Sequence, residues 1–262
     1  MPRNGRAQLY VAQTLANIVG KYDANTGAAI NPVFIAGLAF PEQIVLLGNT
    51  LLVANAGTGT VGEYDATTGA VINASFITGL KSPFGLALLG NTLLVANSGA
   101  GTIEEYDATT GAAINTNFVT GLSFPEGLAL LGNTLFVSNA KVFNYRVGKY
   151  DAKTGAPINP SFVTGLNEPV ALALFGHTLF VANSIPGIIG KYDAKTGATI
   201  DANFITGLSD PKKIALLGDT LFVPNSGSGT VGKYDANTGA AINANFIAGL
   251  KYPFGLAVES AK

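Results

Sequence analysis

Several residue types that build common functional sites are missing or scarce in this sequence. Its 262 residues include no Cys, no Trp, one Met and one His. The absence of Cys excludes disulfide bonds and thiolate chemistry. The single histidine, His177, replaces an Asn in a short turn motif. We therefore interpret it as a turn residue and expect neither a Ser-His-Asp triad nor a histidine metal site.

Charge is scarce as well. Charged residues make up 12% of the chain, the net charge is −1, and Lys and Arg are not clustered. This balance predicts binding neither to nucleic acid nor to an anionic membrane surface. No apolar run approaches the roughly 18 residues that a membrane span needs. The first six residues lack the apolar stretch of a signal peptide, so we expect that a signal was removed or never existed. The uncharged, cysteine-free composition is compatible with a secreted or periplasmic location.

What the sequence has in abundance is repetition. A Tyr-Asp pair followed by Ala-x-Thr-Gly recurs six times, starting at Tyr22, Tyr64, Tyr106, Tyr150, Tyr192 and Tyr234. The spacing is 42 residues in four of the five steps and 44 in the step from Tyr106 to Tyr150. Repeats of this length are typical of propellers and solenoids.

One repeat unit divides into four short predicted strands. In residues 83–122 these are Gly85–Leu89, Leu93–Asn97, Thr102–Asp107 and Asn117–Thr120, which we name strands A to D. Gly, Asn, Thr and Asp separate them, as expected for tight turns. Strands A and B are apolar on both faces, which indicates a sheet covered on both sides, as a propeller blade is by its neighbours. No helical period survives.

The two ends of the chain predict how the ring closes. The chain starts in a strand B, because residues 9–12 match residues 51–54, and it ends in a strand A, because residues 253–258 match residues 83–88. The sequence therefore predicts an all-β, six-bladed β-propeller with four antiparallel strands per blade, forming one domain over residues 1–262. The first blade is shared between about 8–37 and 252–259, so the C-terminal strand closes the ring.

The repeat unit resembles a known family. The motif Leu-Phe-Val-Ala-Asn-Ser…Gly-Lys-Tyr-Asp-Ala-x-Thr-Gly, preceded by Pro-x-Gly-Leu-Ala-Leu, is similar to an NHL-type propeller repeat. More loosely, it resembles the six-bladed gluconolactonase-like and strictosidine-synthase-like proteins and the streptogramin lyases. The resemblance implies the architecture, but that group includes binding scaffolds as well as enzymes. Streptogramin lyases rely on histidine at the channel, and the position of His177 counts against that activity.

The six copies differ mainly in one set of loops. The A–B and C–D turns are nearly uniform, whereas the B–C and D–A loops vary, and one B–C loop, Ala140–Arg146, is longer by two residues. Adjacent strands run in opposite directions, so the variable loops share one face of the disc, which we call the variable face. Binding residues concentrate on loops of a rigid scaffold. The residue after each D–A loop proline should surround the channel mouth. This ring consists of Glu42, Phe84, Glu126, Val170, Lys212 and Phe254, with Gln43 and Lys213 one step further along their strands.

These ring residues are the predicted ligand-binding site. Two carboxylates and an ammonium that converge on a narrow mouth perturb one another's ionisation, which is typical of functional sites. The alternative is a solvated or salt-bridged cluster with no ligand. Aromatic side chains here suit stacking on a sugar or a flat ligand, and inter-blade packing explains them equally well.

Metal binding is a minority prediction. The gluconolactonase resemblance implies a divalent cation held by Glu and Asn or Asp near the mouth, and Glu42 and Glu126 match that kind of position. Phe84, Val170, Lys212 and Phe254 stand where the other ligands would be, so we predict no metal site and no cofactor.

The leading functional hypothesis is a monomeric binding module for a small molecule, glycan or peptide. The second is a hydrolase or lyase of the gluconolactonase or strictosidine-synthase type, with Glu42 or Glu126 as acid/base. The third is a structural or adhesion repeat without a ligand. The near-identity of the copies is also typical of a recently amplified or an engineered sequence.

Overall fold

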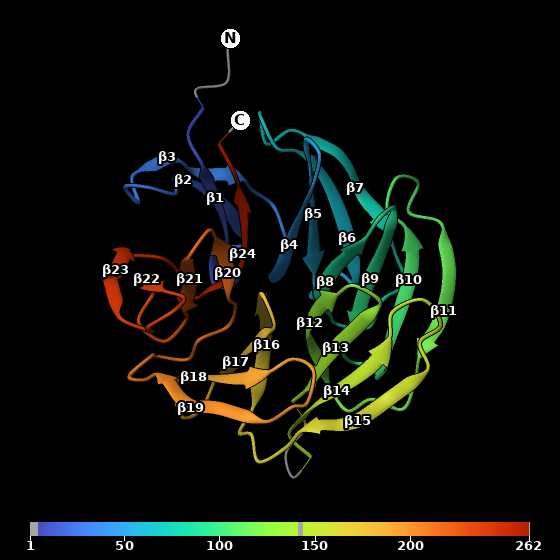
Figure 1. The fold of residues 1–262 in the computed structure, drawn as a ribbon. Helices are drawn as coiled ribbons and strands as arrows, with labels where there is room; N and C mark the ends of the chain where they lie inside the picture. Colours follow the sequence, from blue (N-terminus) through green and yellow to red (C-terminus); the bar gives the residue numbers. More distant parts are fainter. Residues whose placement is uncertain (1–4, 141–143, 262) are drawn as a thin grey trace.

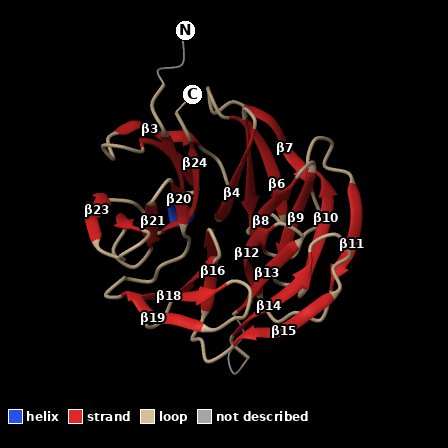
Figure 2. Ribbon diagram, viewed as in Figure 1, coloured by secondary structure: helices blue, strands red, loops and turns tan. Residues whose placement is uncertain are grey.

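The structure is a computed structural model that describes residues 5–140 and 144–261. Part of the long B–C loop, residues 141–143, lies outside the described residues. Figure 1 shows the strands arranged radially around a central axis. Figure 2 shows that nearly all regular structure is strand; within the described ranges the exception is a single 3-10 turn, η1 (Thr14–Ala16). None of the helices described there is long and apolar enough to cross a membrane.

Each blade is a four-stranded antiparallel sheet, six in all. Blade 1 consists of β24 (Pro253–Glu259), β1 (Gln8–Gln13), β2 (Ile18–Asp23) and β3 (Ala29–Ile35). Blade 2 consists of β4 (Pro41–Leu47), β5 (Thr50–Asn55), β6 (Thr60–Asp65) and β7 (Val71–Ile77). Blade 3 consists of β8 (Pro83–Leu89), β9 (Thr92–Asn97), β10 (Thr102–Asp107) and β11 (Ala113–Val119).

The other three blades follow the same order. Blade 4 consists of β12 (Pro125–Leu131), β13 (Thr134–Asn139), β14 (Arg146–Asp151) and β15 (Pro157–Val163). Blade 5 consists of β16 (Pro169–Phe175), β17 (Thr178–Asn183), β18 (Ile188–Asp193) and β19 (Thr199–Ile205). Blade 6 consists of β20 (Ala215–Leu217), β21 (Thr220–Asn225), β22 (Thr230–Asp235) and β23 (Ala241–Ile247). The predicted fold class, a six-bladed propeller, is confirmed.

Closure of the ring is also confirmed. β24 pairs with β1 in antiparallel register, with Leu9 opposite Val258 and Val11 opposite Leu256. Figure 1 shows this C-terminal strand beside β1 and facing the centre. The last strand of the chain therefore completes the first blade and leaves no unpaired inner edge there.

Two strand types differ from the predicted bounds. The outer strand of blade 3 was predicted at Asn117–Thr120, but β11 covers Ala113–Val119. Its first five residues are exposed, so they carry no apolar alternation that a sequence reading could detect. The inner strands begin earlier than predicted, at the loop proline; β8 starts at Pro83 instead of Gly85. Blade 6 is the exception, because β20 is reduced to Ala215–Leu217.

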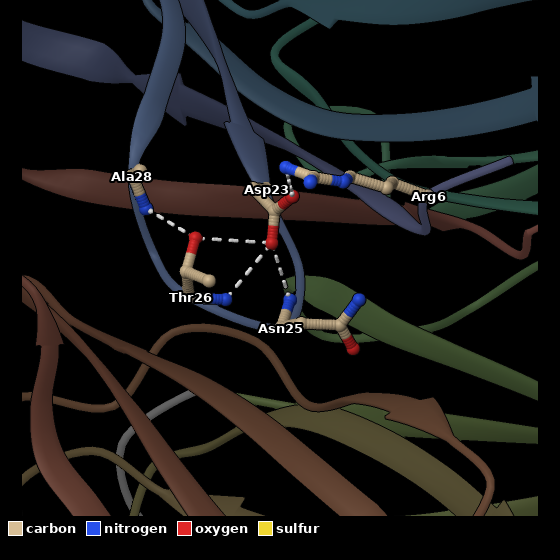
Figure 3. A network of polar contacts seen from close by, with 5 residues as sticks. All are labelled: Arg6, Asp23, Asn25, Thr26 and Ala28. Carbon is tan, nitrogen blue, oxygen red and sulfur yellow. Dashed lines mark hydrogen bonds and ion pairs between the residues drawn. The ribbon is translucent and has the colours of Figure 1, made fainter. Parts of the chain in front are cut away.

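The uniform C–D turns are held by their aspartates. Oδ1 of Asp23 accepts hydrogen bonds from the backbone N–H groups of Asn25 and Thr26, both at 2.9 Å, and from the Thr26 hydroxyl at 3.1 Å (Figure 3). The Thr26 hydroxyl in turn accepts from the N–H of Ala28 at 3.3 Å. The guanidinium of Arg6 lies 3.7 Å from the other carboxylate oxygen. This Asx-type turn explains the conserved Asp-Ala-x-Thr-Gly motif without a calcium ion.

Four of the six blades carry a lysine over aromatic rings of their own sheet, and three of these lysines also donate to a backbone carbonyl of the next blade. In blade 4, Nζ of Lys149 lies 5.6 Å from the ring centroid of Phe136 and 4.7 Å from that of Phe162. The same Nζ donates to the carbonyl oxygen of Ala194 in blade 5 at 3.3 Å. Lys21, Lys191 and Lys233 occupy the matching positions. Glu63 and Glu105 replace this lysine in blades 2 and 3, where the cross-strand partner is Leu instead of an aromatic residue.

Candidate functional site

The candidate site is the channel mouth on the variable face, where the inner strands begin. The chain enters each inner strand through a residue with positive φ that precedes the loop proline. These residues are Phe40, Ser82, Phe124, Glu168, Asp210 and Tyr252, with φ between 48° and 56°. Non-glycine residues adopt this conformation at a cost of roughly 1 kcal/mol or more each. Its presence in all six loops shows that the bend belongs to the scaffold, and that it directs the next residue to the mouth.

Glu42, at the start of β4, is buried with only 6% of its surface exposed. Within the described residues, its Oε2 atom has no hydrogen-bond partner. Burial raises the pKa of this carboxyl to about 8; repulsion from Glu126 adds to the rise, and the Lys212 ammonium opposes it. At neutral pH the group is therefore mostly protonated and carries an O–H donor. An unsatisfied buried carboxyl is unfavourable, so a ligand that supplies a partner gains from it.

Glu126, at the start of β12, has a similar environment. Burial raises its pKa to about 8 as well, with Lys212 opposing the rise and Glu168 and Asp210 adding to it. Glu42 and Glu126 come from blades 2 and 4, and repulsion from Glu126 contributes to the raised pKa of Glu42. The mouth thus holds two carboxyl groups whose ionisation is coupled.

Lys212 is tied to its own loop. Its Nζ lies 2.6 Å from Oδ1 of Asp210 and donates to the hydroxyl of Ser184 at 3.0 Å. The Ser184 hydroxyl also contacts the same Asp210 oxygen, and the Tyr252 hydroxyl donates to Oδ2 of Asp210 at 3.0 Å. The side chain of Lys212 is 11% exposed. Although burial lowers the pKa of Lys212, its hydrogen bond and attraction to Asp210 outweigh burial and raise it. Lys212 is therefore a fixed cation and not a base.

Two aromatic rings cover the centre of the mouth. Phe84 and Phe254 meet edge to face, with centroids 5.8 Å apart and ring planes at 68°. Nζ of Lys212 lies 5.7 Å from the centroid of Phe254. Val170, the ring residue of blade 5, is 6% exposed and packs into the hydrophobic core between blades 5 and 6. The apolar members of the predicted ring therefore narrow the mouth and contact one another.

The next layer forms a tight neck. A Cβ atom added to Gly255 would lie 2.0 Å from the carbonyl oxygen of Glu42, so only glycine fits between these inner strands. Gln43, with 6% exposure, and Lys213 carry the long side chains of this layer. The enclosed cavity has a volume of about 10 Å³, enough for about one water molecule.

Blade 6 departs from its neighbours at this layer. Lys213 stands where Gly85, Gly127 or Gly255 lies in three other blades and where Gln43 lies in blade 2. In blade 6, pairing with β21 begins as an isolated bridge between Pro211 and Asn225. Regular pairing of β20 with β21 starts only at Ala215. The irregular segment between them carries Lys212 and Lys213.

The structure brings together most of the predicted site. Glu42, Glu126, Lys212, Phe84 and Phe254 surround the mouth as predicted, whereas Val170 serves mainly as core.

Sequence reasoning missed Asp210, Ser184 and Tyr252, which position Lys212. Asp210 was detectable as an acid two residues before a ring lysine. The role of Ser184 was not detectable from the sequence. The hydroxyl residues at the equivalent position in blades 1 and 6, Thr14 and Ser226, donate instead to a proline carbonyl oxygen of the next blade.

The repeated amides at the end of strand B have a structural role. Oδ1 of Asn97 accepts from the backbone N–H of Lys81 at 2.6 Å, and Oε1 of Gln13 accepts from that of Lys251 at 2.9 Å. These side chains anchor the D–A loop. The reason is that the ring places that loop beside the end of strand B.

No cluster of three or more His, Asp or Glu residues able to hold a metal occurs in the described part of the chain. At the mouth, Lys212 stands beside the two carboxyls, and a cation there would be repelled. The residues present therefore do not form the oxygen-rich set that a hard divalent cation requires.

Comparison with known proteins supports the architecture. No protein-family model matches the sequence. No curated protein matches it either. Among solved structures, a chain from the crystal structure of a nidogen/laminin complex superposes with a TM-score of 0.84 at 16% identity, covering 98% of this chain and 99% of that chain. The computationally designed Ika8 protein superposes with a TM-score of 0.60 at 16% identity, covering 94% of this chain and 73% of that one. At this identity the likeness defines the class of fold, a β-propeller.

Proposed function

We propose that this chain is a binding module that recognises a peptide segment of a protein partner on its variable face. The observation that carries the proposal is the buried, unsatisfied carboxyl of Glu42 at the channel mouth. A protonated carboxyl donates one hydrogen bond and accepts another, and an amide group of a peptide does the same in the complementary sense. One such amide, inserted at the mouth, would satisfy Oε2 of Glu42.

The distribution of exposed apolar side chains supports a peptide. Large hydrophobic residues that are about half or more exposed occur, within the described residues, on the outer strands and on loops of the variable face. The loop residues are Leu15, Phe40, Phe124 and Ile185, with exposures of 66%, 49%, 53% and 66%. Exposed apolar side chains of this kind can serve as anchors for a protein partner.

The size of the mouth favours a peptide over the other predicted ligands. A volume of about 10 Å³ at the neck admits one small polar group, so a sugar ring or a drug-sized molecule would have to lie on the face outside the channel. A peptide can lie across the face and insert a single group. The similar chain in the nidogen/laminin structure comes from a complex between two proteins, which agrees with this proposal.

The test is selection of binders from a phage-displayed library of random 12-residue peptides, followed by titration of the selected peptides. We expect Leu15→Ser with Phe40→Ser to weaken binding about tenfold or more, because both side chains lose apolar contact area. We expect Glu42→Leu to weaken it as well, because leucine has neither the donor nor the acceptor of the protonated carboxyl.

The matched control is Ile30→Ser with Ile72→Ser, which removes similarly exposed side chains from the outer strands, at 52% and 53% exposure. If the affinity of the peptides falls with this control and not with the changes at Leu15, Phe40 and Glu42, the peptides bind to the outer strands. That result would contradict the proposal.

A further inference from the structure

Lys213 is an unusual lysine in this chain. It lines the neck of the channel with Gln43, Glu126 and Lys212, and it is partly buried. Other lysines of the scaffold have partners; Lys212 binds Asp210, and Lys149 donates to a carbonyl. The structure records no hydrogen bond or ion pair for the amine of Lys213 within its described residues.

Four of the other five blades have glycine or alanine at this position, and blade 2 has the uncharged Gln43. Three of the other blades have glycine in this layer, and a Cβ on Gly85 or Gly255 would meet a carbonyl oxygen at 2.0 Å. Lys213 accompanies the loss of the first part of the inner strand in blade 6. A residue that breaks a structural rule without a compensating contact is more typical of a functional position than of a packing position.

The chemistry of an isolated amine follows from its burial. Removal from water disfavours the ammonium form, and burial lowers the pKa of Lys213 to about 8. At pH 7 about one amine in ten is then neutral, about 200-fold more than for a lysine of ordinary pKa near 10.4. A neutral lysine amine is a nucleophile toward carbonyl carbon.

We propose that the amine of Lys213 is a covalent binding site for a one- or two-carbon aldehyde. Nζ attacks the carbonyl carbon and forms a carbinolamine, while the oxygen takes up a proton. The carbinolamine then loses its hydroxyl with one solvent proton as water, and the amine loses its remaining proton, leaving an imine. The sum is amine plus aldehyde giving imine plus water, and no oxidant or reductant is needed. The volume of about 10 Å³ at the neck sets the limit on aldehyde size.

The experiment uses formaldehyde as the probe and cyanoborohydride to trap the imine. The full chain is treated at pH 7 with formaldehyde at less than one equivalent per lysine, and methylation of each lysine is followed by peptide mass spectrometry. Lys251, an exposed lysine on a loop of the same face, is the internal reference. We expect Lys213 to be methylated about tenfold or more faster than Lys251, with a rate that levels off above pH 8.

Two variants complete the design. Lys213→Arg keeps the positive charge but forms no such imine, so the fast phase should disappear, whereas Lys251→Arg should leave it intact. Methylation of Lys213 at or below the rate of Lys251, or a rate at Lys213 that keeps rising toward pH 10, would overturn the proposal. The outcome does not depend on peptide binding, so the two proposals can fail separately.

Discussion

The buried carboxyls of the mouth predict an unusual dependence of stability on pH. For Glu42, the pKa rises from 4.5 to about 8 on folding. Below pH 4.5 the carboxyl is protonated in both the folded and the unfolded chain. Between pH 4.5 and 8 the unfolded chain releases the proton while the folded chain keeps it, so the free energy of unfolding falls as the pH rises. At about 1.4 kcal/mol per pH unit, the loss approaches about 5 kcal/mol and levels off above pH 8.

Within the described residues, most other titrating groups act outside this window; the exception is Glu105, whose pKa is also raised by burial. The aspartates of the C–D turns have a lowered pKa, as at Asp107, where the backbone N–H groups of Thr110 and Thr109 bind the carboxylate. Their contribution is lost only as the pH falls toward and below 4. The pKa of Lys213 is lowered to about 8, so its unfavourable effect is constant below pH 8 and is relieved above it. The part of a fall in stability between pH 5 and 8 that reports on Glu42 is therefore the part that Glu42→Gln removes.

The measurement is urea unfolding at pH 5.0, 6.5 and 8.0. We expect Glu42→Gln to flatten the pH dependence by about half, because the amide is neutral throughout and Glu126 still titrates with a pKa of about 8. Glu63→Gln, on strand β6 away from the mouth, should leave the slope unchanged. A free energy of unfolding that is constant or rises from pH 5 to 8 would show that the two carboxyls are ionised in the folded chain, and the reasoning would be refuted.

Two further predictions concern the scaffold. Glu105→Lys should raise the free energy of unfolding by about 1–2 kcal/mol, since the new ammonium can stack on the ring of Phe118 and donate to blade 4 as Lys149 does to blade 5; a denaturation midpoint equal to or below that of the parent would contradict this. Deletion of residues 253–262 should remove β24 from blade 1 and open the ring, seen as loss of cooperative thermal unfolding; a deleted chain that melts like the parent would show that the closing strand is dispensable.

Much of the fold was predictable because each repeat carries its own local signals. The Gly-Asn-Thr and Asp-Ala-x-Thr-Gly turns set the strand boundaries, and the match of residues 253–258 to residues 83–88 predicted the closing strand. The loops that differ among copies predicted which face holds the mouth. These signals lie within a few residues of one another, so they need no knowledge of the ring.

The interactions at the mouth required the tertiary structure, because they join blades far apart in sequence. The sequence placed Glu42, Glu126 and Lys212 at equivalent positions, but it could not show that Oε2 of Glu42 lacks a partner or that Asp210 holds Lys212. Burial depends on how closely six inner strands approach, and the pKa of each group follows from that burial.

The last distinction concerns Lys213. From the sequence alone it was simply the residue after a ring lysine. Only closure of the disc shows that its layer is a narrow neck between the inner strands, where the structure records no partner for its amine among the described residues. The sequence by itself determined six blades and the face to inspect. The packing of those blades around one axis decided which side chains there are paired, which are neutral and which are reactive.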